Sequence, residues 1–491
     1  MDILCNIWHW TTNHIALLLM AFYLALAIYI ILMMVLSRLN PVKTLSWIVV
    51  LLTLPYIGII LYLFLGQNHR KRKMYSRKGM RDVAIMDSLG KQQILQIYYA
   101  EWKNAKKIEK FKNTILLQLN NSRALLTYKN KVDVYDNGPD TFAAMKKSIA
   151  EAHFSIHLES YIIEADNIGV EIKELLMRKV QEGVEVRVIY DDIGSWKLPK
   201  QYVSDLKKAG VKIYPFAKVR FPWLSRTVNY RNHRKILVVD GRIGFLGGIN
   251  IADRYVGGGE FNTWRDTHLR IEGEAVHSLQ AAFLLDWFFV SKKQVGQREN
   301  YYPKFDIRNK HYVQVVPSGP DSDWESIMQA YFSAITQAKE HIYIITPYFT
   351  PNDSILTAIK IASLSGVDVR LILPGKSDSK LTYWSTMSYL SELMDAGVKV
   401  YLYQKGFNHS KIITIDGSFA AIGSANMDTR SFEHNFEITA LFYDEHIASQ
   451  LEEHFQTDMK NSRLVRSYRW EKRSYWQKLK EGLARLLSPL L

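Results

Sequence analysis

The apolar residues are concentrated at the start of the chain. Ile15 to Leu36 and Leu45 to Gly66 each cover 22 residues and contain no charged side chain. A helix of that length is roughly 33 Å long, which is enough to cross a hydrocarbon core of about 30 Å. We therefore expect residues 1–66 to form a membrane anchor with two transmembrane helices, at about 15–36 and 45–66. Pro55 and Gly58 lie within the second stretch, where a membrane helix tolerates them.

The residues that flank these stretches predict their orientation. Met1 to His14 has no lysine or arginine, so it lacks the basic start of a signal peptide. Arg38 and Lys43 lie between the stretches, whereas the run His69-Arg-Lys-Arg-Lys73 follows the second one. The positive-inside rule then predicts that both termini, and everything after residue 66, are cytoplasmic.

From residue 131 onward the pattern alternates between helical and strand-like segments. Helices are expected near 140–152, 168–182 and 200–209, and strands near 154–162, 184–190 and 211–215. Adjacent apolar pairs such as Val238 and Val239 indicate strands that are buried on both faces. This pattern predicts an α/β fold in which helices cover a sheet.

The same pattern occurs twice. Gly183-Val-Glu-Val-Arg-Val-Ile-Tyr190 is similar to Gly366-Val-Asp-Val-Arg-Leu-Ile-Leu373, and Ala209-Gly-Val-Lys-Ile-Tyr214 is similar to Ala396-Gly-Val-Lys-Val-Tyr401. We therefore expect two tandem layered α/β domains, at 131–298 and 299–460, related by a pseudo-twofold axis. Residues 67–130 are interpreted as a juxtamembrane connector and 461–491 as a basic tail.

Composition narrows the choice of partners. The formal net charge is +15, which favours an anionic partner, either nucleic acid or an anionic lipid surface. Two membrane spans favour the lipid. The tail supports this interpretation, because Trp476, Leu479, Leu483 and Leu486 recur at helical spacing among basic residues. A tail helix packed against the protein body remains an alternative. Cys5 is the single cysteine, so an intramolecular disulfide and a cysteine-based zinc site are excluded.

A short polar signature also occurs twice. The first copy has His233, Lys235 and Asp240, followed by Gly247-Gly248-Ile-Asn250. The second copy has His409, Lys411 and Asp416, followed by Gly423-Ser424-Ala-Asn426. One copy of such a spacing is common by chance, whereas two copies with the same continuation are not.

These residue types suit chemistry at a phosphodiester. Side chains two positions apart on a strand share a face, so each histidine would lie beside its lysine. One neutral imidazole can attack phosphorus while a second, protonated imidazole donates to the departing alcohol. The lysines would neutralise the phosphate, so no metal or other cofactor is expected. They would also repel a metal cation.

Both signatures resemble those of the phospholipase D superfamily, and the whole chain resembles the bacterial cardiolipin synthases within it. The resemblance implies that both signatures form one site with catalytic roles for His233, Lys235, Asp240, His409, Lys411 and Asp416. It further implies phosphate contacts for Asn250, Ser424 and Asn426. Asp266 and Glu437 occupy positions where the superfamily has acids that orient the histidines. Gly248 departs from Ser424, so the two halves should not be equivalent.

The resemblance implies a phosphatidyltransferase of the bacterial cytoplasmic membrane. It would join two phosphatidylglycerol molecules to give cardiolipin and glycerol, with His233 as the nucleophile and His409 as the acid and base. The reverse assignment of the histidines stays open. A membrane-anchored phospholipase D that releases phosphatidic acid is the main alternative. A nuclease or a non-enzymatic membrane scaffold is less favoured.

Overall fold

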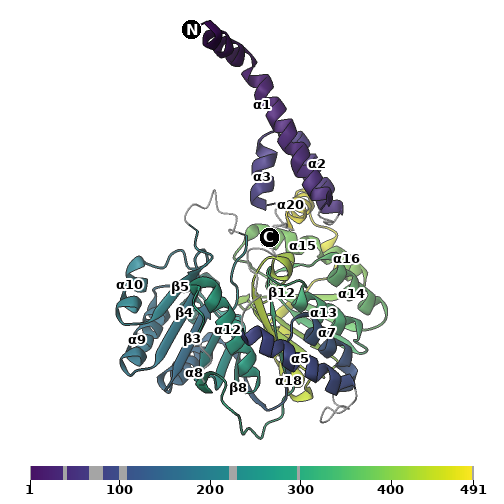
Figure 1. Ribbon diagram of the computed structural model, residues 1–491. Coiled ribbons are helices and arrows are strands. Elements are labelled where there is room, and N and C mark those ends of the chain that lie inside the picture. Colours follow the sequence, from purple (N-terminus) through teal and green to yellow (C-terminus); the bar gives the residue numbers. More distant parts are fainter. Residues whose placement is uncertain are drawn as a thin grey trace. The chain divides into compact units, whose positions relative to one another are not determined.

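The computed structural model describes residues 2–36, 41–65, 81–98, 108–219, 229–295 and 299–488. The chain divides into two compact units (Figure 1). One unit comprises Met1–Met74 with Arg220–Asn229, and the other comprises Tyr75–Val219 with Tyr230–Leu491. The basic run at 69–73 lies outside the described residues.

The N-terminal unit contains helices α1 (Asp2–Leu36), α2 (Pro41–Thr53) and α3 (Ile57–Leu65). Within the described residues, one helical stretch, Leu17–Leu36, is long and apolar enough to cross a membrane. The expected second span is not one helix, because it breaks at Leu54–Tyr56. Pro55 has no backbone N–H to continue the helix, and Tyr56 takes a left-handed conformation with φ 61°.

The larger unit, Tyr75–Val219 with Tyr230–Leu491 and below called the catalytic unit because it contains both signatures, has two sheets built in the same way. The strand order is β8-β7-β6-β3-β4-β5 in the first sheet and β18-β16-β15-β10-β12-β13 in the second. The strands of the first series are β8 (Trp264–Gly273), β7 (Ile243–Gly247), β6 (Ile236–Val239), β3 (Ser155–Ser160), β4 (Glu185–Asp191) and β5 (Lys212–Phe216). Those of the second are β18 (Glu437–Phe442), β16 (Phe419–Gly423), β15 (Ile412–Ile415), β10 (His341–Ile345), β12 (Asp368–Pro374) and β13 (Lys399–Tyr403). The matching order confirms two tandem α/β domains.

Further strands extend each series. In the first sheet, β2 (Asn130–Asn137) and β14 (Phe407–Asn408) lie beside β8. In the second, β9 (Val313–Ser318) lies beside β18, β1 (Leu126–Thr127) lies beside β9, and β19 (Ser462–Leu464) lies beside β13. A separate small sheet pairs β11 (Phe349–Thr350) with β17 (Met427–Asp428).

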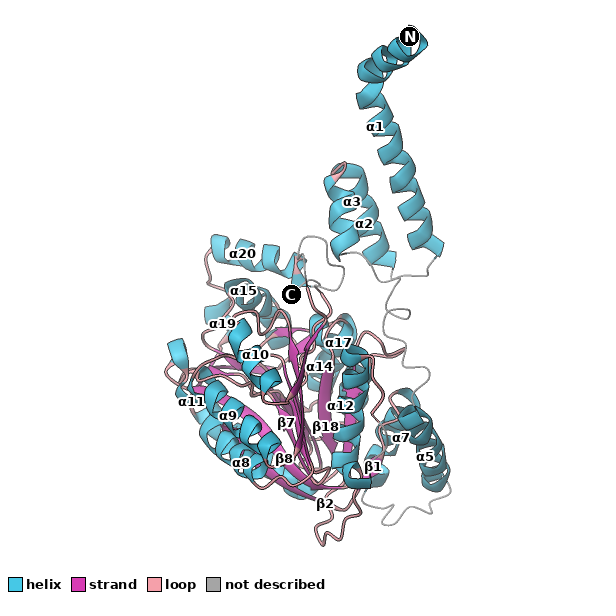
Figure 2. Cartoon of the chain, turned by 60° about the vertical axis from the view of Figure 1, so that its left-hand side comes forward, coloured by secondary structure: helices cyan, strands magenta, loops and turns pink. Residues whose placement is uncertain are grey.

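Helices cover the sheets, as the apolar strands require (Figure 2). Those of the first half are α8 (Gly138–Ala150), α9 (Asn167–Gln181), α10 (Lys200–Lys208), α11 (Arg254–Gly257) and α12 (Ala275–Ser291). Those of the second are α13 (Ser326–Thr336), α14 (Asp353–Leu364), α15 (Lys380–Ser388), α16 (Leu390–Asp395), α17 (Thr429–Glu433) and α18 (Glu445–Lys460). Several begin at a polar cap: the side chains of Asn137, Asp166 and Asn352 accept hydrogen bonds from the first turns of α8, α9 and α14.

The two halves share a core and exchange short segments. Ile236 and Val238 of β6 belong to one buried cluster with Ile412 of β15 and Ile438 of β18. Strand β14 of the second half pairs with β8 of the first half. Asn232 of the first half forms a bridge with Phe436 of the second half. Both exchanges occur directly beside a signature histidine.

The segment expected to be a connector instead contributes to the second half. Its described helices are α5 (Arg81–Tyr98) and α7 (Lys112–Asn121). Phe111, Ile115 and Leu119 are buried in the core of that half, and β1 pairs with β9. The polar composition of this segment concealed the few apolar residues that attach it.

The tail forms α19 (Ser467–Trp470) and the amphipathic helix α20 (Tyr475–Leu486). The face that packs inward is not the apolar stripe: Glu481 and Ala484 are buried. Trp476, Leu483 and Leu486 are 70%, 55% and 77% exposed. The tail helix does pack on the protein body, as the alternative expected, because Arg485 pairs with Glu392 and the buried Glu481 and Ala484 face inward, while the apolar stripe stays exposed.

Candidate active site

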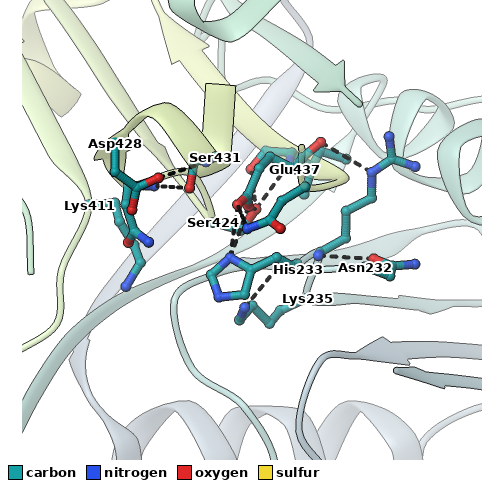
Figure 3. A network of polar contacts seen from close by, with 12 residues as sticks. Asn232, His233, Lys235, Lys411, Ser424, Asp428, Ser431 and Glu437 are labelled. Carbon is teal, nitrogen blue, oxygen red and sulfur yellow. Dashed lines mark hydrogen bonds and ion pairs between the residues drawn. The ribbon is translucent and has the colours of Figure 1, made fainter. Parts of the chain in front are cut away.

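His233 is held by an acid from the opposite half of the molecule. Its Nδ1 lies 3.0 Å from both carboxylate oxygens of Glu437, at the start of β18 (Figure 3). The backbone reinforces this pairing, because the His233 amide donates to the Phe436 carbonyl at 2.9 Å. With Nδ1 donating to a carboxylate, the free lone pair of the ring lies on Nε2.

His409 has the same arrangement with the halves reversed. Its Nδ1 lies 2.8 Å from Oδ2 of Asp266 on β8, and its amide donates to the Arg265 carbonyl at 2.7 Å. Lys411 Nζ is also 2.8 Å from this Nδ1. Nδ1 cannot donate to Asp266 and accept from Lys411 at the same time. We therefore assign a proton to Nδ1, which donates it in a hydrogen bond to the charged Asp266 carboxylate. Each histidine is thus oriented by the acid of the other half, a crossing that sequence order did not reveal.

Burial sets the protonation of the histidines. Burial is the largest cause of a lowered pKa for His233, and the positive charges of Lys235 and Lys411 lower it further against the opposing effect of Glu437. The pKa of His409 falls to about 4, because of burial and the nearby Lys411. Both rings are therefore neutral at pH 7.

The two acids stay ionised in spite of burial. Burial alone would raise the pKa of Glu437, but His233 and Lys235 outweigh it and lower the pKa. The pKa of Asp266 is lowered in the same way, with Lys411 and His409 opposing burial. Ionised carboxylates are the acceptors that hold each Nδ1–H in place.

The two lysines are close enough for the charge of one to affect the pKa of the other. Burial, and to a smaller extent the charge of Lys411, lower the pKa of Lys235 to about 7. Burial likewise lowers the pKa of Lys411 to about 8. The ammonium groups donate to the carbonyl oxygens of His233, at 2.7 Å, and of His409. The lysines influence each other and His233, so both signatures are brought together as expected.

The departure at Gly248 has a steric explanation. A Cβ at Gly248 would lie 2.0 Å from Oδ1 of Asp266. In the second half, the Ser424 hydroxyl donates to Oε2 of Glu437 at 2.5 Å. The Asp266 carboxylate therefore occupies the space beside Gly248, whereas Glu437 meets a serine hydroxyl. The halves differ, as expected, although Ser424 contacts the acid and is not aimed only at substrate.

The two asparagines differ in how they are held. Asn250 is committed on both sides, with its Oδ1 accepting from the Ile162 amide at 3.1 Å and its Nδ2 donating to the Tyr255 hydroxyl. Asn426 is buried, and its Oδ1 meets no hydrogen-bond partner among the described residues. The Asn426 side chain also forms a hydrogen bond with Asp428, so both asparagines already have a partner within the protein.

Asp240 and Asp416 are not brought to the histidines. They follow the lysines by five residues, or roughly 16 Å along an extended strand. Asp240 accepts from the amides of His153, Phe154 and Ser155, at 2.7 to 2.8 Å. Asp416 accepts from Lys339, Glu340 and His341 at 2.8 to 2.9 Å. Both lie at turns with φ of 54° and 50°, where they attach the hairpin to the neighbouring strand.

Sequence reasoning missed the asparagine that precedes each histidine. Asn232 donates to Glu159 and accepts from the Arg234 amide, while Asn408 donates to Asp458 and accepts from the Ser410 amide. Asparagine precedes both histidines in the sequence, so a comparison of the two copies could have identified it. A buried Asp428, whose pKa burial and Glu437 raise to about 6, was also missed and follows the second signature closely.

The polar groups do not form a metal site of the usual kind. Among the residues that the structure describes, no three histidine, cysteine, aspartate or glutamate side chains are grouped to hold a metal ion. The arrangement instead offers two imidazoles and two ammonium groups to an anion.

Comparison with known proteins agrees with the two tandem domains. A family model for the cardiolipin synthase PLD-like domain matches residues 145–287 and 331–459. A model for the phospholipase D-nuclease N-terminal segment matches residues 21–67. In fold, the chain is similar to phosphatidylserine synthase of Haemophilus influenzae Rd KW20, with a TM-score of 0.60, 14% identity and coverage of 76% of this chain and 99% of that chain.

Two curated relatives are much more similar in sequence. Cardiolipin synthase of Halalkalibacterium halodurans is 42% identical over 471 residues, which cover 94% of this chain and 92% of that protein. Cardiolipin synthase 2 of Bacillus cereus is 43% identical over 458 residues, which cover 92% of this chain and 87% of that protein. Both the family model and these relatives match most of the chain: the chain belongs to the cardiolipin synthase family of phospholipase D-like proteins.

Proposed function

We propose that this chain is a phosphatidyltransferase that converts two phosphatidylglycerol molecules to cardiolipin and glycerol. The observation that carries the proposal is the crossed pairing of His233 with Glu437 and of His409 with Asp266. It prepares two imidazoles with free Nε2 atoms beside two ammonium groups, which suits double displacement at a phosphodiester.

In the first half-reaction, Nε2 of His233 attacks the phosphorus of one phosphatidylglycerol. The bond from phosphorus to the headgroup oxygen breaks, and His409 gives that oxygen a proton as glycerol leaves. The phosphatidyl group stays on His233 as a phosphohistidine. Lys235 and Lys411 offset the charge on the nonbridging oxygens, with Asn426 as a further donor.

The second half-reaction reverses these roles. The terminal headgroup hydroxyl of another phosphatidylglycerol gives its proton to His409 and attacks the phosphohistidine. The bond from phosphorus to nitrogen breaks, which releases cardiolipin and restores neutral His233. One phosphodiester is exchanged for another, so no external energy source is required. If water attacks instead, the product is phosphatidic acid.

The assignment of His233 as nucleophile follows the superfamily resemblance. The low pKa of His409 opposes its role as an acid. A bound phosphodiester adds negative charge, which acts in the opposite direction and favours the protonated imidazole. Asp240 and Asp416 are proposed to act through structure, by fixing the strands that carry the lysines.

The membrane supplies both substrates. Helix α1 is long and apolar enough to cross a bilayer. We place the catalytic unit on the cytoplasmic face of a bacterial inner membrane, following the basic run after residue 66. The exposed Trp476, Leu483 and Leu486 of α20 are flanked by Lys478, Lys480 and Arg485, which suits contact with anionic lipid.

The proposal is tested by incubating the purified full-length protein with phosphatidylglycerol bilayers and identifying the products by mass spectrometry. Cardiolipin and glycerol in equal amounts are expected. Phosphatidic acid without cardiolipin would instead establish a phospholipase D. Cleavage of added DNA would indicate a nuclease, and the absence of any product would favour a scaffold.

A further inference from the structure

The second apolar stretch of the N-terminal unit folds back on itself. Helix α2 has 13 residues and α3 has 9, which correspond to about 20 Å and 13 Å. Neither can cross a hydrocarbon core of about 30 Å. A structure made of two such helices therefore cannot supply the straight second span that its composition suggested.

Contacts between α2 and α3 show that they run antiparallel. A Cβ at Gly58 would lie 2.6 Å from the carbonyl oxygen of Val50, which leaves room only for glycine where the helices meet. Farther from the turn, the rings of Trp47 and Tyr62 make an edge contact at 5.5 Å. The end of α3 therefore returns to the level where α2 began (Figure 2).

Helix α1 satisfies the backbone at the turn of this hairpin. Pro55 has no N–H, so the Leu51 carbonyl lacks its usual partner four residues later. The Tyr23 hydroxyl donates to this carbonyl, and the ring of Tyr23 lies 5.1 Å from that of Tyr56. An unpaired backbone group is costly in lipid, so this bond fits a turn buried within the membrane.

The outward faces of the hairpin are apolar. Leu45, Val49, Leu52, Ile57 and Ile60 are 62%, 57%, 61%, 58% and 54% exposed. Tyr23, at the level of the turn, lies 13 residues from the end of α1, a depth of about 20 Å. Beyond it, Leu17, Met20 and Phe22 of α1 are also exposed, at 68%, 60% and 69%. Hydrocarbon would cover all of these surfaces, with α1 alone reaching the far side.

The charges favour the same arrangement. In a two-span topology, Arg38 and Lys43 would lie on the opposite side from the run at 69–73. In a hairpin that enters and leaves on one side, all of these basic residues share the cytoplasmic face. Residues 1–14, which have no lysine or arginine, are then outside.

We propose that α2 and α3 form a re-entrant hairpin in the cytoplasmic leaflet, so that α1 is the single crossing and the N-terminus is external. This inference does not depend on the reaction proposed above. It replaces the expectation that both termini are cytoplasmic. The hydrocarbon that covers the hairpin belongs to the same leaflet through which the substrates diffuse.

The single cysteine provides the test. Spheroplasts that express the full-length chain are treated with a membrane-impermeant maleimide, and Cys5 is compared with a Cys5→Ser/Asn40→Cys variant. A Cys5→Ser/Glu151→Cys variant serves as the cytoplasmic control, because Glu151 is exposed on the catalytic unit. Each cysteine must react when the isolated membrane fraction is dissolved in denaturant, which shows that the protein is present in that fraction.

The hairpin predicts that Cys5 reacts in intact spheroplasts, while the cysteines at 40 and 151 react only after lysis. A two-span protein gives the opposite pattern at the first two positions, with position 40 labelled and Cys5 protected. Labelling of position 40 in intact spheroplasts, or protection of Cys5, overturns the proposal.

Discussion

At the scale of single residues, the contrast between Gly248 and Ser424 shows how the two halves diverged. The Asp266 carboxylate lies where a side chain at 248 would begin, whereas the Ser424 hydroxyl donates to Glu437. Each acid therefore fits the residue beside it: Asp266 needs the space that Gly248 leaves, and Glu437 accepts the hydrogen bond that Ser424 donates.

Gly248→Ser should displace Asp266 and disorient His409. We expect kcat to fall by about 10- to 100-fold, the loss that is typical when the partner orienting a metal-bound histidine is removed. Ser424→Ala is the matched control, since it removes one hydroxyl without a clash, and only a few-fold loss is expected. Equal effects of the two substitutions on lipid turnover would contradict this account of the asymmetry.

The lysines determine the pH dependence. Their pKa values of about 7 and about 8 are depressed by burial, so both become neutral as the pH rises through that range. The charged form binds phosphate, and kcat/KM reports groups of the free enzyme. We expect kcat/KM to fall as the pH rises from 7 to 9, measured with phosphatidylglycerol in vesicles of constant composition. A value that is constant or rising across this range would show that the lysine charge is not required.

The assignment of the histidines is open to direct trapping. If His233 is the nucleophile, a brief incubation with phosphatidylglycerol followed by a denaturing quench at alkaline pH should leave a phosphatidyl group on the peptide that contains His233. His233→Ala should abolish this adduct. An adduct on the peptide that contains His409 would reverse the two roles.

At the scale of elements, the repeat predicted the sheets well. Strand β4 spans Glu185–Asp191 where a strand at 184–190 was expected, and α9 spans Asn167–Gln181 where a helix at 168–182 was expected. These segments are short and periodic, and Asp166 caps the start of the helix. The break in the second apolar stretch could not be predicted in this way, because composition and length cannot distinguish one long helix from two short helices that pack together. The decisive contacts, between Gly58 and Val50 and between Tyr23 and Leu51, are tertiary.

The close approach at Gly58 gives a prediction for the hairpin. Gly58→Ala places a methyl group 2.6 Å from the Val50 carbonyl, an overpacking that costs about 1 to 3 kcal/mol. Amide exchange at residues 54–58 in nanodiscs should quicken by about tenfold or more. Gly90→Ala is the control, because nothing lies within 4 Å of its added Cβ. Unchanged exchange in the Gly58 variant would show that the helices do not pack this closely.

At the scale of the whole molecule, the site belongs to neither half alone. The sequence indicated which residues recur, and most of them do meet. It did not indicate that Glu437 would hold His233 and Asp266 would hold His409, since partners 204 and 143 residues apart are joined only by the facing sheets. Nor did it separate Asp240 and Asp416 from the catalytic residues, because the shared spacing concealed their structural contacts.

The most direct test of a single shared site is the initial rate of cardiolipin formation in His233→Ala, His409→Ala and the double variant. His153→Ala serves as a control, because that histidine is exposed and its side chain lies outside the site. We expect each single substitution to reduce the rate by about 10³-fold or more, with no further loss in the double variant, since the histidines act as one unit. Two independent sites would leave each single variant with about half of the activity, and that result would contradict the account.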